Sequence, residues 1–371
     1  MFPDPFYHAT MVVGQNSLDA HYYDRALKNI LPIRQVVVVG AEGQTDDILK
    51  YIPTSSYNQA VTPSGFEIRY ERQASLLGAG VQALLPKVAV GVVGLGGLGS
   101  FVALELAYLG VGQLVLVDSD VVEMNNLNRM VGAQPNDVGR HKVEVLAKVI
   151  KQCSPGTEVT AVAARILDSE ALDHAKSVDL LLGCVDNHGA RLTLNHLAVR
   201  YLIPLIDAGT GTRLESEGVS SRMGGQVQLV APGVGCLECR GFIDPQRAAF
   251  DLAPADVQEY ERAHGYGTEE AAPSVIFLNG VVASMQVAEA VRLLGGTLNT
   301  AQSTPRLIMY DAGAQSAFVA SLSASPDCAT CGLDGVTGVA DLAPLCPATS
   351  TVGPKIAATI GDGRARSYPN E

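Results

Sequence analysis

A glycine-rich turn between a buried strand and a helix constrains this chain more than any other feature. Lys87–Gly94 (KVAVGVVG) is almost continuously apolar, and the turn GLGGLGS spans Gly94–Ser100. The stretch Ser100–Gly110 keeps apolar residues at helical spacing, and Leu114–Asp118 (LVLVD) has the composition of a second buried strand. A strand–helix–strand unit of this kind predicts a mostly parallel, Rossmann-like α/β sheet with flanking helices.

The glycine turn also predicts a phosphate site. Gly94, Gly96 and Gly99 let the backbone turn tightly and approach a phosphate, which then meets the free N–H groups at the helix N-terminus. Asp118, at the end of the second strand, is placed to bind ribose hydroxyls. These residues suit a nicotinamide-dependent oxidoreductase equally well, and glycines that serve only packing are the simpler alternative.

The polar block after Asp118 argues against hydride transfer. A nicotinamide needs an apolar slot, whereas arginine and lysine near a phosphate stabilise the charge on a transferring phosphoryl group. The string DSDVVEMNNLNRMVGAQPNDVGRHK therefore predicts phosphoryl or adenylyl transfer, with a solvated charged loop as the alternative. The candidate residues in this block are Asp120, Asn125, Asn126, Arg129 and Lys142.

A second carboxylate is predicted at the same edge of the sheet. The motif CVDN, Cys184–Asn187, follows the apolar run Val178–Gly183, so Asp186 belongs at the carboxyl end of a strand. A carboxylate there is well placed to hold Mg²⁺ on triphosphate oxygens. The alternative role for Asp186 is a helix N-cap. Cys184 is expected to be a small buried residue.

Further strands and one long helix extend the predicted sheet. Val275–Leu294 is apolar but is interrupted by polar and charged residues, which predicts a buried helix and not a membrane span. The strand Gln226–Pro232 is expected to run antiparallel. The remaining predicted strands are Tyr201–Asp207, Arg306–Asp311 and Ala317–Ser323.

Four of the seven cysteines form two C-x-x-C pairs, Cys236 with Cys239 and Cys328 with Cys331. Four thiolates suit a closed tetrahedral Zn²⁺ site, which is structural because no position remains open for substrate. The long separation between the pairs predicts that the metal ties the end of the sheet to the C-terminal segment. Free thiols or a redox pair are the alternative.

The first residues form a small separate unit, which we expect to be α+β. A strand at Arg34–Gly40 lies between two stretches with helical spacing, Leu18–Leu31 and Thr45–Ile52. Pro53–Gly65 is rich in Ser, Thr, Pro and Gly and is expected to be a linker. The predicted parts are the N-terminal unit 1–66, the domain 67–335 with the sheet and the zinc knuckle, and a C-terminal tail 336–371, which is expected to be poorly ordered after Cys346.

Composition and charge exclude some function classes. The net charge of −12 argues against a DNA-binding protein, because phosphate neutralisation needs an excess of Lys and Arg. Hydrophobic residues make up 47% and charged residues only 17%, so most of the chain is expected to be packed against itself or against a partner subunit. The start, MFPDPFYHAT, lacks the layout of a secretory signal, so we expect a cytoplasmic protein without a membrane partner.

The ordered set of motifs resembles the ThiF/MoeB/HesA family of adenylating enzymes, relatives of the ubiquitin-activating enzymes. The resemblance extends from about Ile68 to Leu333. It includes RYERQ (Arg69–Gln73), GLGGLGS, DSD, NNLNR, the lysine of GRHK, CVDN, DAGT (Asp207–Thr210) and both cysteine pairs. It implies a Rossmann-like sheet with antiparallel C-terminal strands, and ATP, Mg²⁺ and structural Zn²⁺ as cofactors.

The resemblance also implies a reaction. A substrate carboxylate attacks the α-phosphate of ATP, pyrophosphate leaves, and an acyl-adenylate forms, with Mg²⁺ held by Asp186. Arg72 is similar to the arginine that relatives extend across a dimer interface into the partner's ATP site, which implies a homodimer. The implied nucleotide-binding residues are Gly94, Gly96, Gly97, Gly99, Asp118, Asp120, Asn126, Arg129 and Lys142. The implied catalytic residues are Arg72, Arg129, Lys142 and Asp186.

Two departures narrow the expected substrate. Relatives that form a thioester carry a cysteine after the first zinc pair, whereas Arg240–Ser274 contains none, so the chain is expected to stop at the adenylate or to pass it to an external nucleophile. The unit 1–66 is similar to an attachment in the enzyme that adenylates the microcin C precursor, which implies a peptide or small ubiquitin-like protein as substrate. A dimerisation element is its alternative role. The alternative functions are a sulfur-carrier activator of the molybdopterin or thiamine type, a tRNA-modifying dehydratase and a non-catalytic scaffold.

Overall fold

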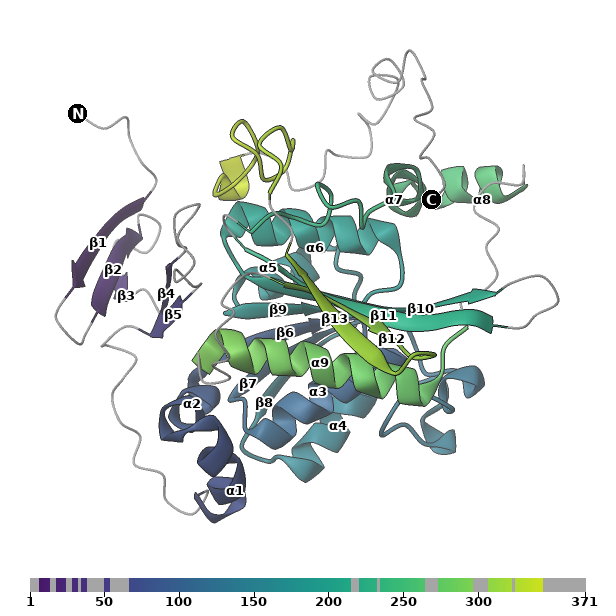
Figure 1. The fold of residues 1–371 in the computed structure, drawn as a ribbon, viewed down its shortest axis with the longest axis horizontal. Coiled ribbons are helices and arrows are strands. Elements are labelled where there is room, and N and C mark those ends of the chain that lie inside the picture. The colour runs from purple at the N-terminus through teal and green to yellow at the C-terminus, as the bar shows by residue number, and fades with distance from the viewer. Residues whose placement is uncertain are drawn as a thin grey trace.

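A computed structural model describes most of the chain between residues 67 and 342, together with five strands that precede it (Figure 1). The described residues form an eight-stranded sheet with the order β13-β12-β11-β10-β9-β6-β7-β8. The predicted α/β class, with a mostly parallel half and an antiparallel C-terminal half, is confirmed. The described ranges are 7–13, 18–24, 29–32, 35–38, 50–53, 67–214, 220–231, 234–263, 273–295, 306–321 and 324–342.

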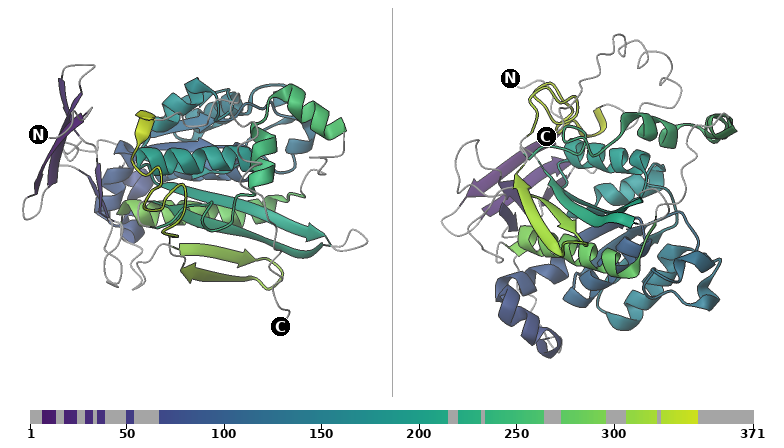
Figure 2. Two further views of the ribbon diagram at one scale, coloured as in Figure 1. Left: turned by 90° about the horizontal axis from the view of Figure 1, so that it is seen from above. Right: turned by 45° about the vertical axis from the view of Figure 1, so that its right-hand side comes forward.

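The parallel half of the sheet carries the glycine turn. The turn joins β6 (Ala89–Val93) to α3 (Gly97–Leu109), and β6 is buried along its whole length because helices cover both faces. Figures 1 and 2 show α6 and α9 on opposite faces of the sheet. The other elements of this half are β7 (Gln113–Val117), α4 (Lys142–Cys153), β8 (Glu158–Val162), α5 (Ser169–Lys176), β9 (Leu180–Gly183) and α6 (His188–Tyr201).

The other half of the sheet reverses direction at its second strand. β10 (Leu205–Leu214) pairs parallel with β9, and β11 (Ser220–Val230) then pairs antiparallel with β10, as predicted. The predicted strand at Tyr201–Asp207 starts too early. Tyr201 ends α6 because Leu202 adopts a left-handed conformation, with φ of 57°, so the strand begins only at Leu205. β12 (Arg306–Asp311) and β13 (Ser316–Ser321) complete the sheet antiparallel.

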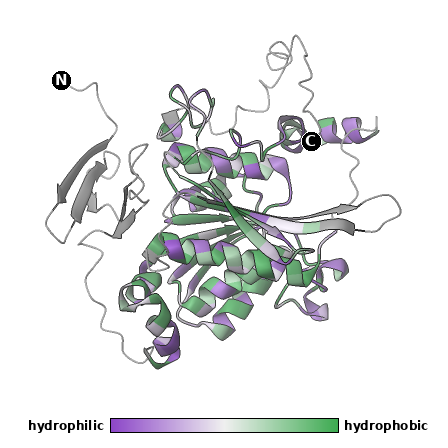
Figure 3. Ribbon diagram, in the orientation of Figure 1, coloured by the Kyte–Doolittle hydropathy of each residue, from purple (hydrophilic) through white to green (hydrophobic). Residues whose placement is uncertain are grey.

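The long apolar helix α9 (Ile276–Gly295) packs against α3, β10 and β11. Within the described residues it is the one helix long and apolar enough to cross a membrane. Its contacts make it a core helix, as predicted, and Figure 3 shows hydrophobic residues concentrated in the strands and on α3 and α9. The remaining elements are α1 (Glu67–Leu77), α2 (Ala79–Leu84), η2 (Leu85–Lys87), η3 (Met124–Asn126), η4 (Pro135–Asp137), α7 (Pro245–Leu252), α8 (Ala255–Ala263) and η5 (Ala340–Leu342).

The N-terminal unit differs from its prediction. Leu18–Leu31 was expected to be helical, but it holds β2 (Leu18–Asp24) and most of β3 (Asn29–Pro32), so this prediction is wrong. The segment HYY favours strand because tyrosine packs well on a pleated surface, and antiparallel pairing on both sides of β2 outweighs the helical spacing. β1 (Tyr7–Val13) completes this three-stranded sheet.

The second half of the unit is also built from strands. Arg34–Gly40 was expected to hold a strand, and β4 (Gln35–Val38) confirms it. β4 pairs with β5 (Lys50–Pro53), so the end of the predicted helix Thr45–Ile52 is strand as well. The rest of that helix, the linker after Pro53 and the tail beyond residue 342 lie outside the described residues. The described part of the unit is therefore β and not α+β.

Candidate functional site

The glycine turn is held in a shape that only glycine allows. Gly94 has φ of +87°, and a Cβ there would lie 2.6 Å from the Cys184 carbonyl oxygen. A Cβ on Gly99 would lie 1.8 Å from the Gly94 carbonyl oxygen, so the first helical turn closes tightly on the strand end. A Cβ on Gly96 would meet nothing within 4 Å. The turn thus leaves an open cradle at the N-terminus of α3, which fits a bound phosphate.

Asp118 fastens this turn to the neighbouring strand. Its Oδ2 accepts a hydrogen bond from the Leu95 N–H at 2.6 Å, and its Oδ1 accepts from the Asp120 N–H at 2.8 Å. Burial raises the pKa of Asp118, while the nearby Lys142 ammonium opposes that rise. The side chain predicted to bind ribose therefore also shapes the phosphate cradle.

The polar block predicted to bind the triphosphate begins beside the cradle. Lys142 Nζ lies 2.8 Å from Asp120 Oδ2, and the lysine stem is buried while the aspartate is 66% exposed. The Arg129 guanidinium donates to the Asn125 carbonyl oxygen, and Arg129 Cδ would lie 3.3 Å from a Cβ on Gly97. The structure thus brings the arginine and the aspartate–lysine pair to the same edge as the glycine turn.

Asn126 has a local structural role. Its Oδ1 accepts from the Glu123 N–H at 3.1 Å, and it forms a capping box with Glu123 around the turn η3. Its Nδ2 donates to Asn125 Oδ1 at 2.6 Å. The side chain therefore stabilises the segment that carries Arg129, and its predicted contact with the triphosphate stays a prediction.

Asp186 is free for a ligand. It follows β9 and is exposed. The alternative N-cap role falls to its neighbour, because Asn187 Oδ1 accepts from the Ala190 N–H at 2.7 Å at the start of α6. Cys184, expected to be buried, is partly buried, and its thiol donates to Gln286 Oε1 at 3.4 Å. Its surroundings raise the pKa of the thiol far above its usual range, which makes it unreactive.

Arg72 lies far from the cradle of its own chain. Gln73, its neighbour on α1, donates to the Leu109 carbonyl oxygen at the C-terminal end of α3. The cradle is at the other end of α3, so about 20 Å of helix separates the two. Arg72 is exposed, on one face of α1 with Ile68 (80% exposed) and Leu76 (76% exposed).

A cavity of about 620 Å³ lies over strands β10 to β13, and we call it the sheet cavity. A Cβ on Gly211 would meet nothing within 4 Å, and a Cβ on Gly209 would meet only Arg191 Nη2, at 3.3 Å. This bare backbone lets an extended chain approach the sheet closely. The residues that define the sheet cavity here are Arg191, Gly209, Gly211, Gln226, Met309 and Phe318.

A buried ion pair closes one end of the sheet cavity. Arg191 Nε lies 3.2 Å from Asp207 Oδ1 and 3.1 Å from Oδ2, and Arg191 Nη2 donates to the Val185 carbonyl oxygen. Burial raises the pKa of Asp207, and Arg191 opposes that rise. The pair fixes α6, which begins beside Asp186, against β10. Sequence reasoning missed Arg191, although an arginine near the start of the helix that follows Asp186 was a usable signal.

Asn279 is a second functional candidate that sequence reasoning missed. It lies on α9, is 1% exposed, and accepts a hydrogen bond from Thr210 Oγ1 at 3.1 Å through Oδ1. Its Nδ2 donates to Ser274 Oγ at 3.0 Å and lies 2.2 Å from the position of a Cβ on Gly97. The amide therefore packs directly on the glycine turn. Its signal in the sequence was an asparagine within the apolar first half of this helix.

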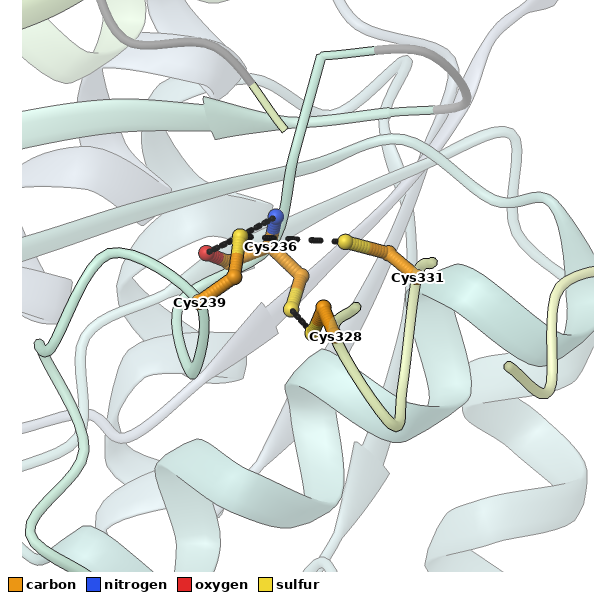
Figure 4. A group of neighbouring side chains, drawn as sticks. All are labelled: Cys236, Cys239, Cys328 and Cys331. Carbon is orange, nitrogen blue, oxygen red and sulfur yellow. Dashed lines mark hydrogen bonds between the residues drawn. The ribbon is translucent and has the colours of Figure 1, made fainter. Parts of the chain in front are cut away.

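The four paired cysteines converge as predicted (Figure 4). The Sγ atoms lie within 4.8 Å of one another, with 3.6 Å between Cys236 and Cys328 and 3.7 Å between Cys239 and Cys331. Disulfide sulfurs would be much closer, and all four thiols are free. Four sulfurs around Zn²⁺ stand about 3.8 Å apart, from a Zn–S bond of about 2.3 Å. The cluster therefore has the donor set and spacing of a tetrahedral metal site.

A buried polar network braces the cysteine cluster. Asn195 Oδ1 accepts from the Leu237 N–H at 2.8 Å, and Asn195 Nδ2 donates to Glu238 Oε2 at 3.0 Å. Thr330, between the second pair of cysteines, also donates to Glu238. Burial raises the pKa of Cys236 to about 11, because a buried negative charge is unfavourable. A metal ion that replaces the thiol proton would compensate this charge.

Comparisons with known proteins agree with this geometry. The ThiF family profile matches residues 70–333. Over 269 residues the chain is 30% identical to the molybdopterin-synthase adenylyltransferase of Escherichia coli K12, covering 71% of this chain and 96% of that protein. It is 31% identical over 270 residues to the sulfur carrier protein ThiS adenylyltransferase of the same strain, covering 71% and 95%.

A solved structure is similar over the same span. The crystal structure of E. coli MccB with MccA-N7isoASN matches with a TM-score of 0.57 and 26% identity, covering 71% of this chain and 75% of that chain. MccB is a microcin C7 biosynthetic enzyme. The predicted resemblance to adenylating enzymes is confirmed, and it reaches from before the glycine turn to beyond the second cysteine pair.

Proposed function

Since the chain belongs to the ThiF family, we propose that it is an ATP-dependent adenylyltransferase that activates the C-terminal carboxylate of a peptide or small carrier protein. The family fixes the class of the reaction. The substrate, the metals and the assembly state are our inference from the described residues. The product is an acyl-adenylate, formed when a carboxylate oxygen attacks the α-phosphate and pyrophosphate leaves.

One observation carries the proposal. The open cradle at Gly96 and the bare strand at Gly211 are linked through β10. Asn279 contacts the glycine turn and, on the α9 face of the sheet, Thr210 of β10, while Gly211 faces the sheet cavity on the opposite face. The cradle suits the phosphates of ATP, and the sheet cavity suits an extended C-terminal tail, because glycine leaves the backbone accessible. A carboxylate at the end of such a tail is proposed to reach the α-phosphate of the nucleotide in the cradle.

The residues around the cradle have different proposed roles in the reaction. Arg129 and Lys142 supply positive charge where negative charge grows on the α-phosphate, and Asp118 keeps the turn in shape while it accepts ribose hydroxyls. Asp120 holds Lys142 in place before the nucleotide arrives. The exposed Asp186 carboxylate is a hard oxygen ligand suited to Mg²⁺, which would neutralise charge on the leaving pyrophosphate.

The cysteine cluster is proposed to hold structural Zn²⁺. The four sulfurs join the segment after β11 to the segment after β13, so a metal there fastens the antiparallel half of the sheet at the end of α6. No sulfur remains free to bind substrate in a closed four-thiolate site. The free state of the thiols suits the reducing interior of a cell, and we place the protein in the cytoplasm.

A homodimer is proposed from the exposed face of α1. Ile68, Arg72 and Leu76 are spaced four residues apart and therefore line one exposed face of this helix. Two apolar side chains flanking an arginine suit an interface, and the distance of Arg72 from its own cradle leaves it available to the cradle of a second copy. Each active site would then be shared between two protomers.

Two classes of substrate are supported by separate observations. MccB was crystallised with MccA-N7isoASN, which favours a peptide, and the extra strands before α1 are proposed to help bind it. The two E. coli adenylyltransferases named above favour a sulfur-carrier protein as the alternative. Arg240–Ser274 contains no cysteine, so the adenylate is proposed to pass to an external nucleophile in either case.

The proposal is tested by ATP–pyrophosphate exchange with candidate peptides and small proteins encoded beside the gene. Exchange that requires one such partner, and that is lost in Asp186→Ala, supports carboxylate adenylation. ATP binding without exchange for any partner points to a scaffold. Exchange driven by tRNA alone points to the tRNA-modifying alternative, and both of these results overturn the proposal.

A further inference from the structure

Asn279 stands out because a buried amide is costly in an apolar helix. Its neighbours on the sheet-facing side of α9 are Leu278, Val282 and Ala283, all at most 1% exposed. Burying an amide costs several kcal/mol unless it is hydrogen-bonded, and a leucine of similar volume would avoid that cost. The amide is therefore better explained by what it contacts than by packing.

The contacts of Asn279 reach three separate segments. Oδ1 accepts from Thr210 Oγ1 on the α9 face of β10, the strand whose opposite face lines the sheet cavity. Nδ2 donates to Ser274, two residues before α9 begins. The same nitrogen packs on Gly97, where a Cβ would lie 2.2 Å away. One planar amide thus touches the floor of the phosphate cradle and the strand of the sheet cavity.

We propose that Asn279 is a positioning residue that couples nucleotide binding in the cradle to the sheet cavity, an inference that rests on the proposed function. Phosphates bound at the glycine turn fix the backbone at Gly97, on which the amide rests. The fixed amide then holds Thr210 and Ser274 through hydrogen bonds of 3.1 Å and 3.0 Å. Binding of ATP would in this way order β10 beneath the sheet cavity and set the approach of the carboxylate to the α-phosphate.

Two other polar residues of α9 form hydrogen bonds that hold elements together but do not contact the glycine turn. Gln286, the second buried amide, donates to the carbonyl oxygens of Gly183 and Ile206 and holds two strand ends together without contacting the turn. Ser284 is exposed and donates to Glu105 on α3 at 2.7 Å. Ser284→Ala therefore removes one hydrogen bond from the same helix, away from both sites, and serves as the matched control.

The test is hydrogen–deuterium exchange with AMPCPP and Mg²⁺, which needs no substrate partner. In the wild type and in Ser284→Ala, we expect the nucleotide to slow amide exchange at least about fivefold in peptides covering both the glycine turn and β10. In Asn279→Leu, which matches the side chain in volume, protection is expected to remain at the turn and to disappear from β10.

Three outcomes of this experiment would count against coupling by Asn279 or against the proposed adenylyltransferase function. Protection of the turn alone in the wild type, or protection of both segments in Asn279→Leu, overturns the coupling while the proposed function stands. No protection anywhere means that the chain does not bind the nucleotide, which contradicts both. Once a partner supports exchange, Asn279→Leu should lower kcat at least about tenfold while the KM for ATP moves less than about threefold. A merely structural role would lower the active fraction without this dependence on bound nucleotide.

Discussion

Lys142 Nζ lies 2.8 Å from Asp120 Oδ2, which holds the ammonium group at the edge of the phosphate cradle. The lysine is the first residue of α4, and its backbone N–H also donates to the Asp120 carbonyl oxygen at 3.0 Å. The ammonium is thus fixed both through its own side chain and through the helix that carries it. A charge fixed before the nucleotide arrives needs no reorganisation when charge develops on the α-phosphate.

This arrangement predicts a large effect from one substitution. Lys142→Met keeps the buried stem but removes the charge, so the exchange rate is expected to fall by about 10² to 10³. Lys148→Met, on the exposed face of the same helix, is the matched control and should leave exchange close to wild type. Equal rates for the two variants would remove Lys142 from the mechanism.

Asp118 predicts a pH dependence of nucleotide binding. Burial raises its pKa, so the carboxyl takes up a proton at a higher pH than an exposed aspartate does. Protonation removes an acceptor from the Leu95 and Asp120 N–H groups, so ATP affinity is expected to fall as the pH is lowered. Calorimetric titrations between about pH 8 and pH 5 measure this, since that range lies above the ordinary carboxyl value.

The control for this titration is Asp118→Asn, which cannot ionise. Its ATP affinity should be lower than that of the wild type at neutral pH. After correction for the titration of ATP itself, its affinity should not fall further as the pH is lowered, whereas that of the wild type should. The same step in both proteins would show that another group titrates.

The cysteine cluster predicts one metal ion per chain. Cys328→Ser removes one of four thiolates, so we expect loss of zinc in elemental analysis and a melting temperature lower by several degrees. Cys153→Ser changes a free thiol outside the cluster and should leave both quantities unchanged. Full zinc content and unchanged melting in Cys328→Ser would refute a four-sulfur site.

The shared active site predicts complementation between two inactive variants. Arg72→Ala and Asp186→Ala are each expected to lose exchange activity. Mixed under conditions that allow subunit exchange, they should regain activity at about a quarter of the sites, because half of the dimers are mixed and one of their two sites is complete. A mixture as inactive as its parts would place Arg72 outside the partner's site.

The part of the fold that the sequence predicted best is the part buried on both faces. β6 and β9 are continuously apolar because helices cover them above and below, so both strands were predicted, although each predicted run begins two residues before its strand. β8 lies at the edge of the sheet with mixed exposure, and no strand was predicted there. In the N-terminal unit, the pairing of strands outweighed helical spacing.

The site was predictable only where residues follow one another in the chain. The glycine turn, Asp118 and Lys142 belong to one continuous motif with a known spatial order. Thr210 and Asn279 are 69 residues apart, and Arg191 meets Asp207 only because α6 packs on β10. Contacts of this kind depend on how helices pack on the sheet, which the local pattern does not encode.

Activation of a C-terminal carboxylate is tested by comparing a partner that has a free C-terminus with the same partner carrying a C-terminal amide. We expect ATP–pyrophosphate exchange with the free carboxylate, none with the amide, and a trapped product whose mass has increased by one adenylyl group. Exchange that persists with the amidated partner would contradict activation of the C-terminal carboxylate.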